Sequence, residues 1–134
     1  MTETTTRPDG DVVQIAVPAD TGYVATLRLT AASLAARCDL TIDDIEDLRL
    51  AVDEACSLLL PHSASPGVFS ARFVLAAGEL SVAVSIACAD AEVHLDREGF
   101  AWTVLAALAS SVAVDNENGR LAVTVTKRRE AAQR

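Results

Sequence analysis

The chain has 134 residues, 51% of them hydrophobic, and its formal net charge at pH 7 is −8. This length suits one domain with one core, and an aromatic content of only 4% implies a core built from Ala, Val and Leu. The acidic charge argues against a nucleic acid as the main partner and suits binding to a basic protein surface.

The N-terminal part of the chain predicts a strand followed by a helix. Residues 1–10 are polar and are expected to form a tail outside the domain. Residues 11–17, with the sequence DVVQIAV, carry apolar side chains at every second position, which is typical of a strand with one buried face. Apolar residues then recur every three or four positions from about Thr21 to Cys38, which is the spacing of an amphipathic helix.

A second helix is predicted after a short polar interruption. Either Thr41 or Asp43 can cap its N-terminus, and it runs to about Leu60, directly before Pro61. Glu54 falls on or beside the polar face of this helix. A solvated helix charge is therefore the favoured interpretation of Glu54, and a catalytic base is the alternative.

The second half of the chain predicts a hairpin, a third helix and a final strand. The strands at residues 68–76 and 80–88 alternate and are joined by a tight AGE turn. After a polar loop, residues 99–112 predict a helix that is apolar almost all round and is therefore expected to be well buried. The sequence NENG indicates a turn before the last strand at residues 120–128, and VAVD at residues 112–115 could add one more short strand.

These elements give the order β-α-α-β-β-α-β within a single domain of residues 11–129, followed by a tail at residues 130–134. Strands joined by hairpins indicate a mainly antiparallel sheet with one solvent-exposed face, and the three helices would cover the other face. The predicted fold class is therefore α+β, as a two-layer α/β sandwich.

Sequence motifs for metal or phosphate binding are missing, so no metal site is predicted. The three cysteines (Cys38, Cys56 and Cys88) are far apart among apolar residues, which is typical of buried free thiols in a cytosolic protein. His62 and His94 are isolated. The N-terminus lacks a signal-peptide core and the longest apolar tract is too short to cross a bilayer, so we expect a cytoplasmic protein that does not bind membranes.

The segment from Asp39 to Glu54 is the most charged part of the chain. It contains seven carboxylates and a single basic residue, Arg49, which can pair with Asp53 four positions later. Within it, DDIEDLRLAVDEAC at residues 43–56 is the most specific string. Together with GFAWTVLAALASSVAV, LAVTVTKRR and the run from Pro18 to Arg28, it resembles the RsbW-type anti-sigma factors of the GHKL (Bergerat) ATPase-like fold.

This resemblance covers roughly residues 11–129 and looks nearest to the actinobacterial UsfX-like branch. It implies a homodimeric anti-sigma factor that keeps an alternative sigma factor from RNA polymerase and is released by an anti-anti-sigma partner of the STAS fold. A DNA-binding partner of this kind is expected to present basic helices. The acidic residues that we expect to meet it are Asp43, Asp44 and Asp47.

The resemblance also implies a nucleotide site. Many family members are serine kinases in which a Glu is the general base and an Asn four residues later holds Mg²⁺. Glu54 matches that Glu, whereas the Asn position holds Leu58. Asp90 matches an Asp that contacts adenine, and Glu92 stands where the DxGxG motif has a glycine.

Two specific functions are compatible with this pattern, besides the broader interpretation of a GHKL-like domain with some other partner. The first, which we prefer, is sequestration of a sigma factor by a protein with a degenerate nucleotide site and no bound cofactor. The alternative is an active serine kinase that uses ATP and Mg²⁺ to phosphorylate its STAS antagonist. The apolar Leu58 favours the first, because leucine offers magnesium no oxygen ligand.

Overall fold

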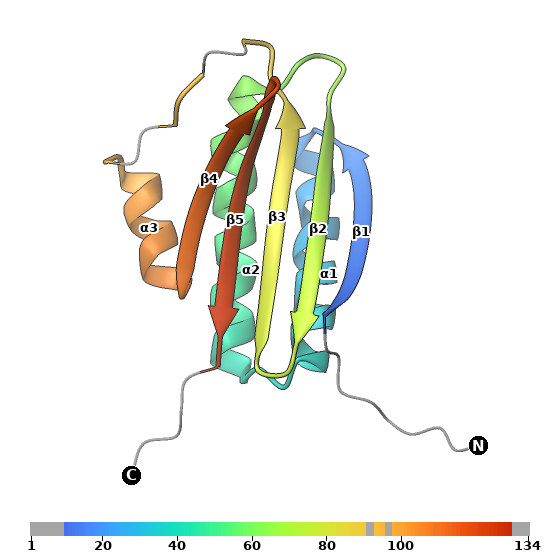
Figure 1. The fold of residues 1–134 in the computed structure, drawn as a ribbon, viewed down its shortest axis with the longest axis vertical. Helices are drawn as coiled ribbons and strands as arrows, with labels where there is room; N and C mark the ends of the chain where they lie inside the picture. The colour runs from blue at the N-terminus through green and yellow to red at the C-terminus, as the bar shows by residue number, and fades with distance from the viewer. Residues whose placement is uncertain (1–9, 91–92, 96–97, 130–134) are drawn as a thin grey trace, which may run out of the picture.

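The computed structural model describes residues 10–90, 93–95 and 98–129 of the chain. A five-stranded antiparallel sheet forms one layer, and helices cover one of its faces (Figure 1). The predicted α+β sandwich is therefore confirmed. Residues 1–9 and 130–134, where tails are predicted, lie outside the described residues, so the domain limits stay a prediction.

The sheet has the strand order β1-β2-β3-β5-β4, and every neighbouring pair of strands is antiparallel. Single-turn 3-10 helices precede the first α-helix and follow the second, at Thr21–Tyr23 and Leu60–His62. The main elements in chain order are β1 (Asp11–Pro18), α1 (Val24–Arg37), α2 (Ile42–Leu59), β2 (Val68–Ala76), β3 (Glu79–Ala87), α3 (Phe100–Leu108), β4 (Ser111–Glu117) and β5 (Arg120–Arg128).

The N-terminus of α2 is fixed by a capping box. The Thr41 hydroxyl accepts a hydrogen bond from the Asp44 backbone N–H at 3.1 Å, and the Asp44 carboxylate accepts one from the Thr41 N–H at 3.2 Å. Both bonds satisfy backbone donors that the first turn of a helix leaves without partners. Thr41 rather than Asp43 is therefore the cap.

The β4–β5 hairpin turns at Asn118 and Gly119, whose φ angles are +55° and +78°. Two consecutive left-handed residues match the right-handed twist of the paired strands, and Asn-Gly adopts this conformation readily. The turn predicted from NENG is therefore confirmed.

One aliphatic core lies between the sheet and the inner sides of α1 and α2. Phe73, Val82 and Val125 stand side by side on three neighbouring strands and are fully buried. The helices present small residues to them, such as the fully buried Ala31 and Ala51. Alanine lets the helix backbones approach the sheet closely, which is how a core poor in aromatic residues reaches dense packing.

α3 differs from its prediction in length and in burial. It ends at Leu108 rather than at residue 112, because Ser111–Glu117 forms a complete strand that is longer than the predicted VAVD. Leu105 is the only fully buried residue of this wholly described helix, and Phe100 is 83% exposed. The helix lies at the edge of the molecule beside β4, and among the described residues its main contacts are with α2 and β4 (Figure 1).

The cysteines are free thiols, as predicted. Cys38 and Cys56 are buried, whereas Cys88 is only half-buried. Burial raises the pKa of Cys56 to about 12, and the negative charge of Asp53 adds to the effect. Cys56 is therefore a protonated, apolar member of the core at neutral pH and not a nucleophile.

Candidate functional site

α2 lies between α1 and α3 (Figure 1). Its polar side chains divide into two flanks, each with its own ion pairs. On the α1 flank, the Arg28 guanidinium donates to the Asp53 carboxylate at 2.9 Å. Arg49 pairs with Glu46 at 2.9 Å. The predicted pairing of Arg49 with Asp53 is therefore wrong, because α1 supplies the cation that Asp53 binds.

On the opposite flank, Lys127 joins three elements. Its ammonium group donates to the Asp47 carboxylate at 3.1 Å and to the carbonyl of Leu108, the last residue of α3, at 2.8 Å. The Lys127 side chain is only 12% exposed, so these two acceptors offset the cost of removing the charge from water. Lys127 therefore holds the C-terminus of α3 against α2 and β5.

We expect Lys127→Met to loosen α3 while leaving the sheet intact. Methionine keeps an apolar stem but removes both hydrogen bonds, at a cost of about 1–2 kcal/mol since Asp47 remains partly solvated. Amide hydrogen exchange should become faster in α3 and stay unchanged in β2 and β3. Arg128→Met, which removes an exposed pair with Glu79, is the control. Equal protection of α3 in both variants would contradict the role given to Lys127.

Glu54 lies on the flank that faces α3. It follows Asp47 by seven residues, close to two helical turns, so both side chains project toward the same side. Glu54 is half-buried, and its carboxylate makes no hydrogen bond or ion pair with the part of the chain that the structure describes. Leu58, one turn further, is half-buried and packs against the core. By resemblance, Glu54 stands at the position of the general base and Leu58 at the position of the Mg²⁺ ligand. The structure therefore has a carboxylate at the first position and an apolar side chain at the second.

The three carboxylates predicted to meet a partner have different surroundings. Asp44 is 8% exposed and serves the capping box of α2. Asp47 is paired with Lys127. Asp43 is exposed and forms no ion pair within residues 10–90, 93–95 and 98–129. Asp43 is therefore the member of this group whose charge is most available to a partner.

Asp90 follows β3 at the end of the molecule where α2 also ends. The neighbouring Ala89 N–H donates to the carbonyl of His62, just beyond α2, at 2.9 Å. Asp90 itself is exposed. It therefore lies about two helical turns beyond Glu54 along the direction of α2. Glu92, at the position of a motif glycine, lies outside the described residues.

A small cavity lies on the helix side of the sheet, next to the segment at residues 93–95. The Asn116 side chain holds this segment by donating to the carbonyl of Val93 at 2.7 Å. The cavity has a volume of about 200 Å³, below the range of roughly 300–1,000 Å³ usual for small-molecule sites. The described residues that line it, none of which is Lys or Arg, are Val93, His94, Leu95, Val114, Asn116 and Leu121.

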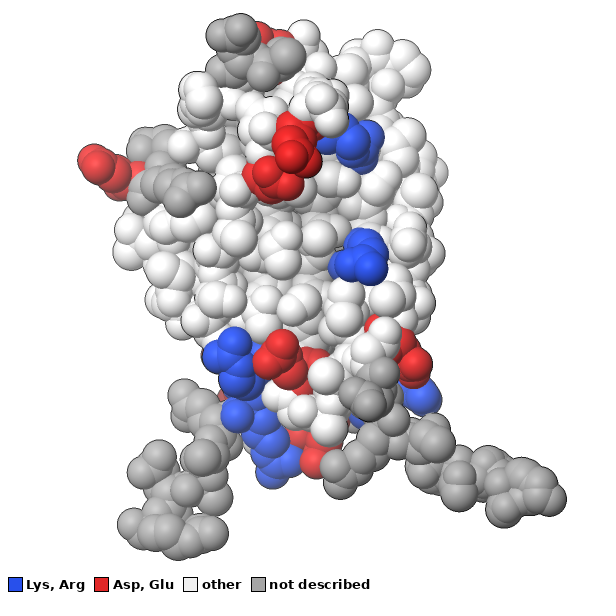
Figure 2. Space-filling view, in the orientation of Figure 1, with Lys and Arg blue, Asp and Glu red and all other residues white. Residues whose placement is uncertain are grey.

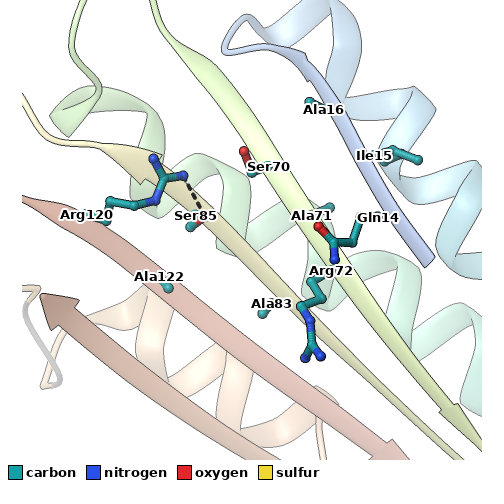
Figure 3. A pocket seen from close by; sticks show the side chains of 10 residues that line it. All are labelled: Gln14, Ile15, Ala16, Ser70, Ala71, Arg72, Ala83, Ser85, Arg120 and Ala122. Atoms are coloured by element: carbon teal, nitrogen blue, oxygen red, sulfur yellow. Dashed lines mark hydrogen bonds between the residues drawn. The ribbon is translucent and has the colours of Figure 1, made fainter. Parts of the chain in front are cut away.

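A larger cavity of about 440 Å³ lies on the open face of the sheet (Figure 3). Arg72 and Arg120 stand at its edges, and small side chains such as Ala83 and Ser85 form its floor. The Arg120 guanidinium donates to the Ser85 hydroxyl at 2.9 Å. Figure 2 shows that the middle of this face carries few charges. The sheet separates this cavity from Glu54, so it is no part of the site that the resemblance implies.

Within the described ranges, no three His, Cys, Asp or Glu side chains gather as a metal site would require. Among the same residues, no helix combines the length and the apolar content needed to span a bilayer. Lys127 and Arg28 were not singled out from the sequence. The position of Lys127 could have been predicted from the sequence. Side chains alternate between the two faces of a strand, and Lys127 follows the buried Val125 by two residues, so it lies on the core side of β5.

Comparison with known proteins gives one family model and a set of relatives. The model described as a histidine kinase-like ATPase domain matches residues 17–127. The chain is 38% identical over 78 residues to the serine-protein kinase RsbW of Bacillus velezensis, covering 56% of this chain and 49% of that protein. It is also 38% identical over 82 residues to RsbW of Bacillus subtilis, covering 59% and 51%. The chain thus spans about half the length of the curated relatives it matches.

A solved structure has the same fold. The crystal structure of the RsbU and RsbW domains of Rv1364c from Mycobacterium tuberculosis superposes with a TM-score of 0.66 at 22% sequence identity. The match covers 88% of this chain and 32% of that one. The GHKL-like architecture predicted by resemblance is therefore confirmed, whereas the nearer likeness to the UsfX-like branch stays a prediction.

Proposed function

The chain belongs to the histidine kinase-like ATPase domain family, and we propose that it is an anti-sigma factor that sequesters an alternative sigma factor without nucleotide chemistry. The similarity to proteins named RsbW supports the choice of partner. The observation that carries the choice of mechanism is Leu58, an apolar side chain packed against the core at the position implied for a Mg²⁺ ligand.

The described residues do not fit a magnesium–nucleotide complex. Magnesium takes oxygen ligands, and Leu58 offers none. A general base needs a hydroxyl or water held within hydrogen-bond reach, yet no described residue orients the Glu54 carboxylate. The cavity beside Val93 is small, and none of the described residues that line it is a Lys or Arg that could neutralise phosphate charge. We therefore propose that Glu54 acts as a surface charge.

Sequestration requires only a surface that complements the sigma factor. A net charge of −8 favours encounter with a basic partner, and Asp43 and Glu54 place carboxylates on one side of α2. Release by a STAS anti-anti-sigma protein, homodimerisation and action in the cytoplasm belong to the same proposal and rest on the resemblance. An active serine kinase remains the alternative because the relatives carry that name.

Calorimetry with Mg-ATP tests the mechanism. We expect no binding tighter than about 100 μM, equivalent to roughly −5.5 kcal/mol. Leu58→Asn is the matched variant, because it replaces the apolar side chain by one that offers an oxygen ligand. Micromolar affinity in the native protein, together with phosphate transfer to a STAS protein that Glu54→Gln abolishes, would establish the kinase alternative.

Capture of the tagged protein from its native host, followed by mass spectrometry, tests the partner. We expect a sigma factor to be recovered, and the purified pair to form a complex without added nucleotide. Repeated capture of other proteins without any sigma factor would contradict the proposed function.

A further inference from the structure

The outer surface of α3 is apolar although it faces water. The helix Phe100–Leu108 contains no charged residue, and Phe100 is 83% exposed in its first turn. Val104 and Ala107 follow Phe100 at spacings of four and seven residues, so all three lie on one side of the helix. An exposed apolar strip of this kind marks a surface that another molecule covers.

α2 carries a further exposed apolar residue. Leu50 is 54% exposed, so it projects away from the core. α2 and α3 contact each other, and α3 lies beside β4 at the edge of the sheet (Figure 1). We refer to the outward surface formed by Leu50, Phe100, Val104 and Ala107 as the α2–α3 face.

The border of the α2–α3 face is acidic. Asp43 precedes Leu50 by seven residues and Glu54 follows it by four, so both carboxylates share its side of α2. Neither forms an ion pair within the described residues. The only basic residue of α2, Arg49, is paired with Glu46, and α3 has none. The carboxylates at this border are therefore not neutralised by cations from either helix.

We propose that the α2–α3 face binds a positively charged amphipathic helix of the protein partner. The apolar side of that helix covers Phe100 and Leu50, and its Lys or Arg side chains pair with Asp43 and Glu54. This is the usual geometry of helix-in-groove recognition. A second copy of this chain would bring like charges together, and an anionic membrane would be repelled. The inference rests on the proposed function and specifies the chemistry of its partner.

Trp102 makes the proposal measurable, because it is the only tryptophan of the chain and it lies on α3. The probe is a synthetic peptide of about 18 residues, or about five helical turns, built from Leu and Lys with Leu at helical spacing. We expect the peptide to change Trp102 fluorescence saturably, more strongly at low salt. A peptide with Glu in place of every Lys should leave the fluorescence unchanged.

Two variants show where the peptide binds. Phe100→Ser should weaken binding about tenfold, as expected for removal of an aromatic anchor. Leu29→Ser, which removes an exposed leucine on α1, is the matched control and should bind like the native protein. Equal affinity in all three proteins, or equal binding of the Glu peptide, would overturn the proposal. So would self-association by light scattering that Phe100→Ser abolishes, or saturable binding to anionic vesicles.

The sigma factor recovered from the host separates this inference from the proposed function. Tight binding by the native protein that Phe100→Ser weakens and Leu29→Ser preserves supports both. Tight binding that Phe100→Ser leaves unchanged overturns the α2–α3 face alone. Capture experiments that recover no sigma factor refute the proposed function, whereas the peptide measurement still decides whether the face binds basic helices.

Discussion

Phe73→Ala should lower the free energy of unfolding by about 3–5 kcal/mol, because it removes a large side chain from the middle of a closed core. Phe73 is fully buried on β2, between the sheet and the helices. The chain has only three phenylalanines, and two of them, Phe69 and Phe73, are fully buried. The surrounding Ala and Val side chains are too short to fill the space that is left.

Urea unfolding followed by circular dichroism measures this loss. Val74→Ala is the matched control, because its side chain is half-buried on the opposite, open face of the same strand. We expect it to cost less than about 1.5 kcal/mol, in line with the removal of partly exposed methyl groups. Similar losses for the two variants would show that the helices do not bury the Phe73 face of the sheet.

The double variant Asp43→Asn and Glu54→Gln should slow association with the sigma factor about tenfold at low salt. The two carboxylates attract a basic partner over distances longer than a hydrogen bond, and salt screens that attraction over about 10 Å at 0.1 M. Stopped-flow association rates at several salt concentrations measure the effect. The native and variant rates should converge as the salt concentration rises.

A control variant with the same change in net charge shows whether the location of the carboxylates on α2 matters, or only the net charge of the protein. Asp115→Asn and Glu117→Gln alter two exposed carboxylates of β4 that point to the open face of the sheet. This control should associate almost as fast as the native protein. If both double variants slow association equally, net charge matters and the α2 carboxylates have no special role.

The fold was predictable because the sequence features that determine it act between residues that are close together in the chain. The alternation of the strands, the Asn118–Gly119 turn and the Thr41 cap each act within a few residues. The end of α3 was not predictable in the same way, because ALASSVAV is apolar without a distinct period. Pairing of β4 with β5 decides that Ser111 begins a strand, and that pairing is a tertiary contact.

The candidate site was predictable only in part, for a related reason. The helical spacing correctly placed Glu54 at the edge of a polar face. The partner of Asp53 could not be read from the sequence, since Arg28 comes from a different helix and Arg49 was the nearer cation. The exposure of Phe100 depends on α3 lying at the edge of the molecule, which is a tertiary arrangement that the local sequence does not reveal.

Assembly of the sigma factor with core RNA polymerase, in the absence of any nucleotide, tests sequestration most directly. A fluorescently labelled sigma factor should fail to join the core enzyme once it is mixed with an equal amount of this protein. Leu58→Asn should block assembly to nearly the same extent. Assembly that proceeds unhindered until Mg-ATP is added would contradict the account, because the nucleotide site would then be needed to hold the sigma factor.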